Sequence, residues 1–381
     1  MTKENKNKKR LSFKDSQITF TVVSILLGLL VGAIVLALAG YNPLEAYQKI
    51  IEGIFKSPRN MGWAIVNSTP IILTGLGDRK STGLGVCFAF KTGLFNMGAE
   101  GQFIIGTVVG FLMGYLLDLP PVIHVFVTVV AAIIAGFIYG GLAGFVKAKF
   151  GIHEVISTIM LNWIAFYFQN FIVYRYQMPN SMSSYNVNES AQITLVKNAA
   201  QKYDGFFGQF FKAPIHLGIV FAIICAVLIY YILEKTSLGY KLKAVGLNKE
   251  ASKYGGINVN AKIVQSMAIS GALCSLAGVS QILGYTYSLP LLSGMENFGF
   301  DGLAVALLAS NNPIACIFSG LFLGSLKYAG GNLQRTMGVP SELISIIIGT
   351  IILFTAIPLI FKILRAKINR NSKRKVGKKN A

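Results

Sequence analysis

The chain has 381 residues, of which 53% are hydrophobic and only 13% charged, and its mean hydropathy is +0.58. This composition excludes an ordinary soluble domain and is typical of a protein that crosses a membrane several times. The net charge of +20 would suit nucleic-acid binding, but the basic residues gather beside apolar runs. We therefore expect the lipid bilayer as a partner and no nucleic acid.

Three basic clusters predict the orientation of the chain. Residues 1–17, 234–262 and 362–381 are rich in lysine and arginine, whereas residues 175–213 hold only four basic residues. Lysine and arginine gather on the cytoplasmic side of membrane proteins. We expect a multi-pass protein of the cell membrane with a basic cytoplasmic N-terminus at 1–17 and a basic cytoplasmic tail at 362–381. Its membrane domain would cover 18–361.

The apolar runs predict an all-α bundle of about ten membrane-spanning helices, since about 20 apolar residues span a bilayer as a helix. An even number also agrees with both termini being cytoplasmic. The segment 175–213 would be an external loop and 234–262 a cytoplasmic loop. The predicted spans are 18–40, 61–77, 86–117, 122–146, 154–174, 214–233, 263–283, 300–309, 313–329 and 340–361.

One predicted span begins with a polar break. The stretch KTGLFNMGAEGQ, residues 91–102, combines three glycines with charged and amide side chains. Such groups are costly in hydrocarbon and face the protein interior or a water-filled path. We expect Asn96 to cap a helix whose first turn holds Glu100, and Asn96, Glu100 and Gln102 either to line a substrate path or to hold a structural corner.

A related pattern occurs near the C-terminal end. In GMENFGFDGLAVALLASNNP, residues 294–313, glycines and the acidic Glu296 and Asp301 precede a short apolar helix. The two broken segments would be the corresponding halves of an internal repeat, a common feature of transporters.

Two further patterns concern packing and docking. Gly106, Gly110 and Gly114 recur every fourth residue, as do three glycines in the next span, so we expect these consecutive helices to pack along their glycine stripes. The second stripe consists of Gly136, Gly140 and Gly144. Within 234–262, the stretch NKEASKY predicts a short helix over 248–254, suited either to docking a soluble partner or to a solvated loop.

No cofactor or metal site is expected. The four cysteines form no CxxC pair and the three histidines are scattered. GLGDRKST, residues 75–82, lacks both glycines of a phosphate-binding loop, because Thr74 and Arg79 stand in their places. ATP would therefore be bound by another chain, and no catalytic constellation is present.

Three blocks in order carry a family resemblance. TPIILTG (69–75) with FAFKTGLFNMGAEGQ (88–102), then AVGLNKEASKYGGI (244–257), and then GFDGLAVALLASNNP (299–313) resemble permease subunits of ABC importers in the branched-chain amino acid, ribose and nucleoside group. The GAEGQ form is similar to that of the nucleoside branch. The chain departs from the family pattern where TGLG is repeated around Asp78, so that eight residues look inserted up to Gly85.

The resemblance implies an inward-transporting permease rather than an enzyme. Its partners would be a cytoplasmic ATP-binding subunit, a second and different permease subunit, and an external substrate-binding lipoprotein. The expected contacts with the ATPase are Gly246, Asn248, Glu250, Ala251, Tyr254, Gly255 and Gly256. The expected substrate path comprises Asn96, Glu100, Gln102 and Asp301 with the amide and aromatic residues Asn67, Asn162, Trp163 and Phe166.

Two alternatives remain open on the residues alone. An ion-coupled secondary transporter would use Glu100 and Asp301 as proton or cation sites, and it would take up substrate without an ATPase. A membrane-embedded enzyme would need a catalytic constellation, which the sequence does not suggest.

Overall fold

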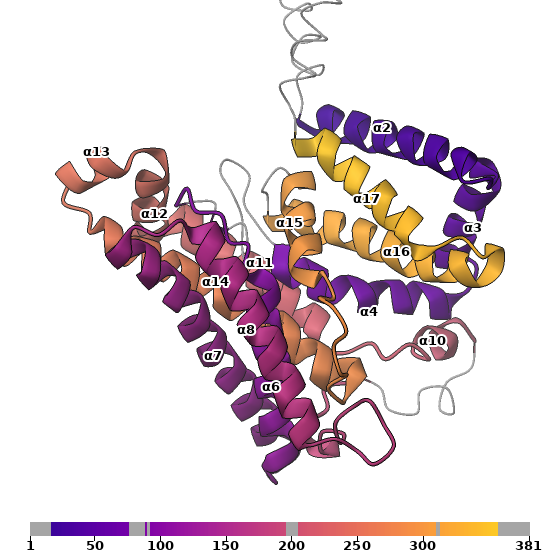
Figure 1. Ribbon diagram of the computed structural model, residues 1–381, viewed down its shortest axis with the longest axis horizontal. Helices are drawn as coiled ribbons and strands as arrows, with labels where there is room; N and C mark the ends of the chain where they lie inside the picture. Colours follow the sequence, from indigo (N-terminus) through magenta and orange to yellow (C-terminus); the bar gives the residue numbers. More distant parts are fainter. Residues whose placement is uncertain (1–16, 76–87, 90–91, 196–204, 310–312, 357–381) are drawn as a thin grey trace, which may run out of the picture. The chain divides into compact units, whose positions relative to one another are not determined.

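The computed structural model describes residues 17–75, 88–89, 92–195, 205–309 and 313–356 (Figure 1). Within these ranges the chain is helical, and its only β-type pairings are isolated bridges, so the predicted all-α class is confirmed. The chain divides into two compact units, one drawn from residues 1–46 and 337–381 and the other from residues 47–336. The apparent insertion Asp78–Gly85 lies outside the described residues.

The first unit pairs the two ends of the chain. Helix α2 (Gln17–Leu38) packs against α17 (Ser341–Ala356). The Ser24 hydroxyl donates to the carbonyl of Phe354 at 3.3 Å, and the Thr350 hydroxyl donates to the carbonyl of Gly28 at 3.2 Å. Small polar residues thus join two apolar helices through backbone carbonyls, as is usual between membrane helices.

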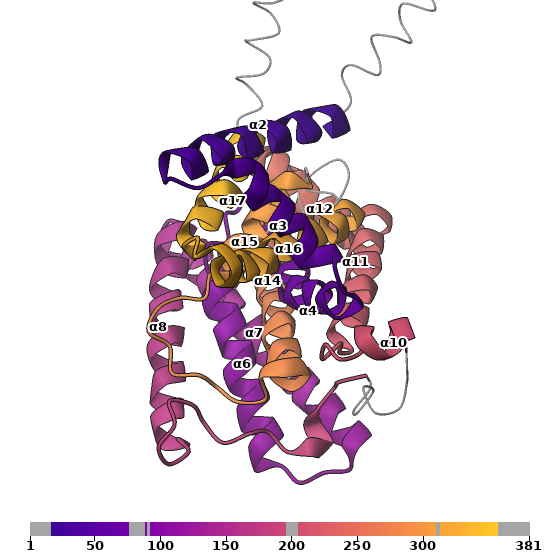
Figure 2. The same cartoon turned by 90° about the vertical axis from the view of Figure 1, so that its right-hand side faces the viewer.

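The second unit contains most of the helices (Figures 1 and 2). The boundary between the two units falls within helix α3. The elements are α3 (Pro43–Phe55), α4 (Pro58–Gly75), α6 (Ala99–Leu116), α7 (Pro121–Phe150), α8 (Glu154–Arg175), η1 (Glu189–Ala191), α10 (Gly205–Phe210), α11 (Gly218–Lys235), α12 (Ser237–Leu247), α13 (Lys249–Tyr254), α14 (Val259–Gln281), the π-helical turn η2 (Ile282–Thr286), α15 (Phe298–Leu308) and α16 (Pro313–Met337).

Helix α14 is the centre of this unit. It packs against both α6 and α7, and most of its residues are buried (Figure 1). A Cβ atom on Gly106 would lie 2.1 Å from the carbonyl oxygen of Ser275, and one on Gly140 would lie 2.4 Å from that of Met267. Both glycine stripes therefore face α14 rather than each other, which corrects the sequence expectation. The reason is that α14 itself carries small residues, including Gly271, where backbones can approach.

The predicted count of ten spans is not confirmed. Five of the described helices are long and apolar enough to cross a membrane, or six if the bent pair formed by α2 and α3 is one span. The five are α6, α7, α8, α11 and α14 with η2. Helix α15 has 11 residues and α17 has 16, so both are shorter than the roughly 20 residues that a straight span needs.

The second expected break is also present. After η2 the chain is irregular until α15 begins at Phe298. Figure 2 shows this irregular chain passing beside α8. The Gln169 amide donates to the carbonyl of Pro290 at 3.1 Å, and Asn170 exchanges hydrogen bonds with the backbone of Leu292. Two amide side chains of α8 thus hydrogen-bond backbone groups of this irregular chain, which have no partners within a helix.

Candidate functional site

The broken start of α6 is built on Asn96. Its Oδ1 accepts the N–H of Gly98 at 2.9 Å, and its Nδ2 donates to Gln102 Oε1 at 2.8 Å and to Ser270 Oγ at 2.6 Å. The cap residue of α6 is Gly98, without a side-chain cap, so the expectation that Asn96 caps the helix is wrong. Asn96 instead forms a turn ahead of the helix and ties it to α14.

Glu100 lies in the first turn of α6, as expected, and is 1% exposed. Its Oε1 accepts the N–H of Asn297 at 2.9 Å and its Oε2 accepts that of Gly299 at 2.6 Å. These donors belong to the start of α15, where the orphan N–H groups of a helix favour a negative charge. One carboxylate therefore joins the starts of both broken helices.

Asn162 of α8 clamps the same corner. Its Oδ1 accepts the N–H of Gly101 and its Nδ2 donates to the carbonyl of Met97, both at 2.8 Å. Phe166, one turn further along α8, is 7% exposed, whereas Trp163 is 44% exposed and packs edge-on against Phe166. The structure thus brings Asn162 to Asn96, Glu100 and Gln102, while Trp163 turns away from them.

Asp301 forms an ion pair with Lys327 of α16. Asp301 Oδ2 lies 2.6 Å from Lys327 Nζ, which also lies 4.6 Å from the centre of the Phe298 ring. Lys327 was missed in the sequence, although a lysine inside the apolar run 313–334 is a signal by itself. Among the described residues, no three His, Cys, Asp or Glu side chains form a group able to hold a metal ion.

Asn67 lies on α4 and is hydrogen-bonded within that helix. Its Nδ2 donates to the carbonyl of Trp63 one turn earlier, at 2.9 Å. Both side chains are half-buried. Trp63 stands edge-to-face with Tyr285 of η2, with 6.4 Å between ring centres. Among the sequence-predicted path residues, Asn67 on α4 thus stands apart from those at the joined starts of α6 and α15, where Asn162 of α8 also binds.

The predicted docking helix is present as α13. Asn248 caps it by accepting the N–H of Ala251 at 3.0 Å, and Gly256 follows with a φ of +75°. Tyr254 is 93% exposed and Glu250 is exposed beside it. The helix and both of its end signals are thus confirmed, and most of its residues are exposed. Gly246 and Gly255 lie just outside its two ends.

A backbone contact joins this docking segment to the start of α6. Gly93 has a φ of +67°, and a Cβ atom there would lie 3.5 Å from the carbonyl oxygen of Gly246. Gly93 belongs to a turn in which Thr92 and Leu94 both donate to the carbonyl of Ala89. Gly246, near the end of α12, thus lies close to the turn that leads into Asn96.

An ion pair fixes the connection between α7 and α8. Lys147 donates to Glu154 Oε2, and Glu154 Oε1 accepts the N–H of Phe95 at 3.3 Å. Gly151 between the two helices has a φ of +69°. Glu154 therefore ties the α7–α8 corner to the turn that precedes α6.

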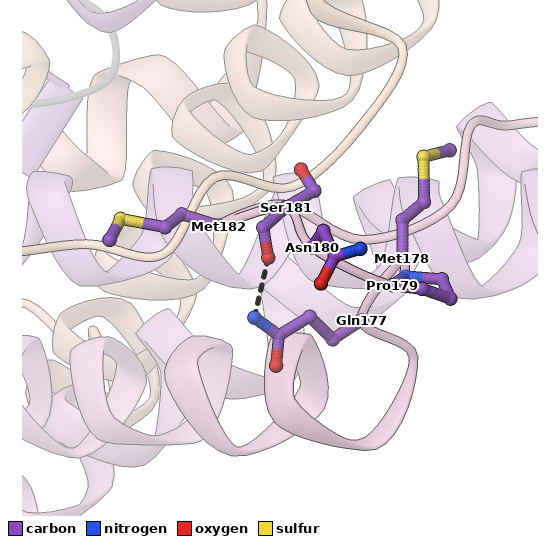
Figure 3. A pocket seen from close by; sticks show the side chains of 6 residues that line it. All are labelled: Gln177, Met178, Pro179, Asn180, Ser181 and Met182. Carbon is purple, nitrogen blue, oxygen red and sulfur yellow. Dashed lines mark hydrogen bonds between the residues drawn. The ribbon is translucent and has the colours of Figure 1, made fainter.

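A shallow pocket lies in the loop after α8 (Figure 3). It is lined by Gln177, Met178, Pro179, Asn180, Ser181 and Met182. Gln177 Nε2 donates to the carbonyl of Ser181 at 2.5 Å and closes the loop on itself. The pocket is formed by one turn of chain, and none of the sequence-predicted site residues lies in it.

Comparison with known proteins identifies the family. Residues 81–356 match the family described as "Branched-chain amino acid transport system / permease component". The chain belongs to this permease family. The permease is 35% identical over 356 residues to the guanosine ABC transporter permease protein NupP of Bacillus subtilis (strain 168). The aligned residues make up 93% of this chain and 97% of NupP.

Two further relatives of the permease cover most of both chains. The nucleoside ABC transporter permease protein NupB of Lactococcus lactis subsp. cremoris (strain MG1363) is 31% identical over 93% of this permease and 94% of NupB. The glucose ABC transporter permease protein TsgB13 of Haloferax volcanii is 28% identical over 91% of this permease and 89% of TsgB13. No solved structure matches the permease.

The family excludes the membrane-embedded enzyme, one of the two alternatives that the sequence left open. A permease component is a transport subunit, so the chain is a multi-pass membrane protein and not an enzyme. The resemblance predicted from the three sequence blocks is confirmed, including its nucleoside relatives.

Proposed function

We propose that the chain is one permease subunit of an ATP-driven importer for nucleosides or related small molecules. The main support is that this chain is similar, over nearly the whole of both chains, to relatives named as guanosine and nucleoside ABC transporter permeases. A similar match to a glucose permease is 28% identical and keeps sugars within the proposed range.

The proposed assembly has four kinds of chain. A cytoplasmic ATP-binding subunit would supply the energy and dock on α13, whose exposed Glu250 and Tyr254 offer a charged and an aromatic contact. A second, different permease subunit would complete the membrane part as a heterodimer, and an external lipoprotein would deliver the substrate. Both termini and the segment 234–262 would be cytoplasmic, which their lysine and arginine content supports.

The proposed route of coupling runs through backbone contacts. A shift of α13 and α12 would reach Gly93 through Gly246, and from there the broken start of α6. Glu100 would pass the same shift to α15, because its carboxylate binds N–H groups of both Asn297 and Gly299. Rigid elements joined by close contacts can carry such a movement between sites.

The proposed path residues have two roles. Asn96, Gln102 and Asn162 are buried and bonded to protein groups, so they would hold the broken helix beside the path. Asn67 and Asp301 are partly exposed and would face the substrate, together with the aromatic Trp163 and Phe166 of α8.

Uptake by the reconstituted complex tests the function. The permease, its second permease subunit, the ATPase and the lipoprotein are placed in vesicles, and uptake of radiolabelled guanosine is measured with and without ATP. We expect uptake only when ATP and all four proteins are present. Uptake by this chain alone, driven by an ion gradient, would instead establish the ion-coupled alternative that uses Glu100 and Asp301.

A further inference from the structure

Three aromatic rings lie in contact between α4, α11 and the end of α14. Trp63 meets Tyr285 edge-to-face at 6.4 Å, and His216, just before α11, stacks on Tyr285 with 6.3 Å between ring centres. Trp63 and Tyr285 also pack against the buried residues Val66, Ala213 and Ile215. Both large rings are only partly buried, so part of their surface stays open for another contact.

Two buried polar atoms beside Tyr285 have no hydrogen-bond partner. Gln281, one turn before Tyr285, is 6% exposed, and its Oε1 is unpartnered. His216 is 2% exposed; its Nδ1 accepts the N–H of Gly218 at 3.1 Å, which leaves the proton on Nε2, and Nε2 is unpartnered. Unpaired buried polar atoms are rare in folded proteins and need an explanation. An acceptor and a donor, both unpartnered, thus lie beside the Tyr285 ring.

The backbone at this place also departs from regular helix. Helix α14 ends in the π-helical turn η2, which carries Tyr285, and Tyr287 follows with a φ of +58°. π-turns and left-handed cap residues are common where helices end, so this ending fixes the position of the Tyr285 ring beside Trp63 and His216.

The chemistry that suits this group is a nucleobase. Such a ligand has a flat π face that can stack on Trp63, an edge that can meet Tyr285 at right angles to Trp63, and N–H donors for Gln281 Oε1. We propose that Trp63, Tyr285 and Gln281 form a nucleobase-binding station on the transport path, with His216 positioning the Tyr285 ring. The proposal rests on the proposed nucleoside importer and names the residues that recognise the base.

The same three rings could instead be a packed aromatic core that binds no ligand. A core would need the rings only for their volume, whereas a nucleobase station needs their π faces and the amide of Gln281. Three variants separate these roles. Trp63→Leu keeps apolar bulk, whereas Trp63→Phe also keeps a stacking surface. Gln281→Met keeps the length of glutamine without its hydrogen bonds. Phe137→Leu on α7, where Phe137 is 46% exposed, is the matched control.

The test uses the full four-protein complex in vesicles. Guanosine and cytidine uptake are measured over a range of substrate concentrations, together with ATPase activity without substrate. We expect Trp63→Leu to lower uptake efficiency by roughly tenfold or more, in line with the loss of one stacking contact, and to lower guanosine uptake more than cytidine uptake. Trp63→Phe should retain most uptake, Gln281→Met should shift the guanosine-to-cytidine ratio, and Phe137→Leu should resemble the parent.

Two outcomes would overturn the station, and each differs from failure of the proposed function. In the first, Trp63→Leu and Gln281→Met both transport with the parent's efficiency and base preference. In the second, photo-crosslinking of the parent complex with 8-azidoguanosine labels neither residues 58–75 nor 281–287, although the complex is transporting. If the parent complex takes up no nucleoside at all, the proposed function itself is wrong.

Discussion

Glu100 Oε2 accepts a hydrogen bond from the backbone N–H of Gly299 at 2.6 Å, across 199 residues of sequence. The second carboxylate oxygen accepts the N–H of Asn297. A Cβ atom on Gly299 would lie 2.3 Å from the backbone nitrogen of Glu100, so the two helix starts meet backbone to backbone. The polar break before α6 and the break before α15 are therefore one structural feature.

The first prediction concerns this carboxylate. Glu100→Gln keeps the shape of the side chain but turns one acceptor oxygen into a donor that faces an N–H group. We expect the variant to lose about 1–3 kcal/mol of stability, the usual result of leaving a buried donor unsatisfied. Its apparent unfolding temperature in detergent should fall below that of the exposed control Glu250→Gln. A variant of unchanged stability with an altered substrate preference would show instead that Glu100 contacts substrate.

The second prediction concerns the glycine stripe of α7. A Cβ atom at Gly140 would lie 2.4 Å from the carbonyl oxygen of Met267, whereas one at the neighbouring Gly141 would lie 3.4 Å from Ala268, an ordinary contact. Gly140→Ala should therefore force α7 and α14 apart and reduce the yield of folded protein, while Gly141→Ala should not. Gel-filtration recovery from membranes gives the comparison, and equal recovery of both variants would contradict the contact with α14.

The third prediction concerns the docking helix. Glu250→Arg together with Tyr254→Ala changes the charge and removes the aromatic ring from the exposed side of α13. We expect loss of ATPase binding and of uptake with the fold unchanged, since both side chains are exposed. The control Asp118→Arg with Tyr174→Ala makes the same chemical changes at exposed residues elsewhere. Survival of both ATPase binding and uptake would mean that the coupling surface is elsewhere.

The fourth prediction concerns pH. Burial lowers the pKa of His216 to about 4. In the unfolded chain histidine has a pKa near 6.5, so the unfolded state binds this proton more readily than the folded state. The free energy of unfolding therefore falls as the pH decreases from about 6.5 to about 4, by about 3 kcal/mol in all. Above about pH 6.5 both states are neutral and the effect vanishes.

His216→Asn isolates this contribution. Asparagine can still accept the N–H of Gly218 near the position of Nδ1, but it does not titrate. The unfolding temperature of the parent in detergent should therefore fall more steeply on acidification from about pH 7 to about pH 4.5 than that of the variant. Parallel curves for the two proteins would show that His216 is protonated equally in the folded and unfolded states.

The sequence predicted local features well because each has a local cause. The helix of residues 249–254 follows from the Asn248 cap and the Gly255–Gly256 stop, and both signals act within one turn. The break before α6 follows from glycines and polar groups that an uninterrupted apolar helix would not hold. The helical class follows from composition, because hydrocarbon leaves backbone groups no partner outside a helix or a closed barrel.

The sequence did not predict which distant groups meet. A glycine stripe shows that a backbone can approach, but not which one, so α7 was assigned to the stripe of α6 when α14 faces both. The sequence predicts Asn96 as a cap because asparagine suits one, yet its amide binds Gln102 six residues further on and Ser270 of α14, which lies far away in the sequence. Such contacts depend on how the helices are arranged around α14, and no spacing within one segment encodes that arrangement.

The contacts of α14 with Gly106 and Gly140 have a mechanical consequence. Where carbonyl oxygens sit in the place of a missing side chain, helices cannot slide or rotate past one another without colliding. We therefore expect α6, α7 and α14 to keep their positions relative to one another during transport. A movement that starts at α13 would therefore shift these three helices together, along with the start of α15 that Glu100 binds.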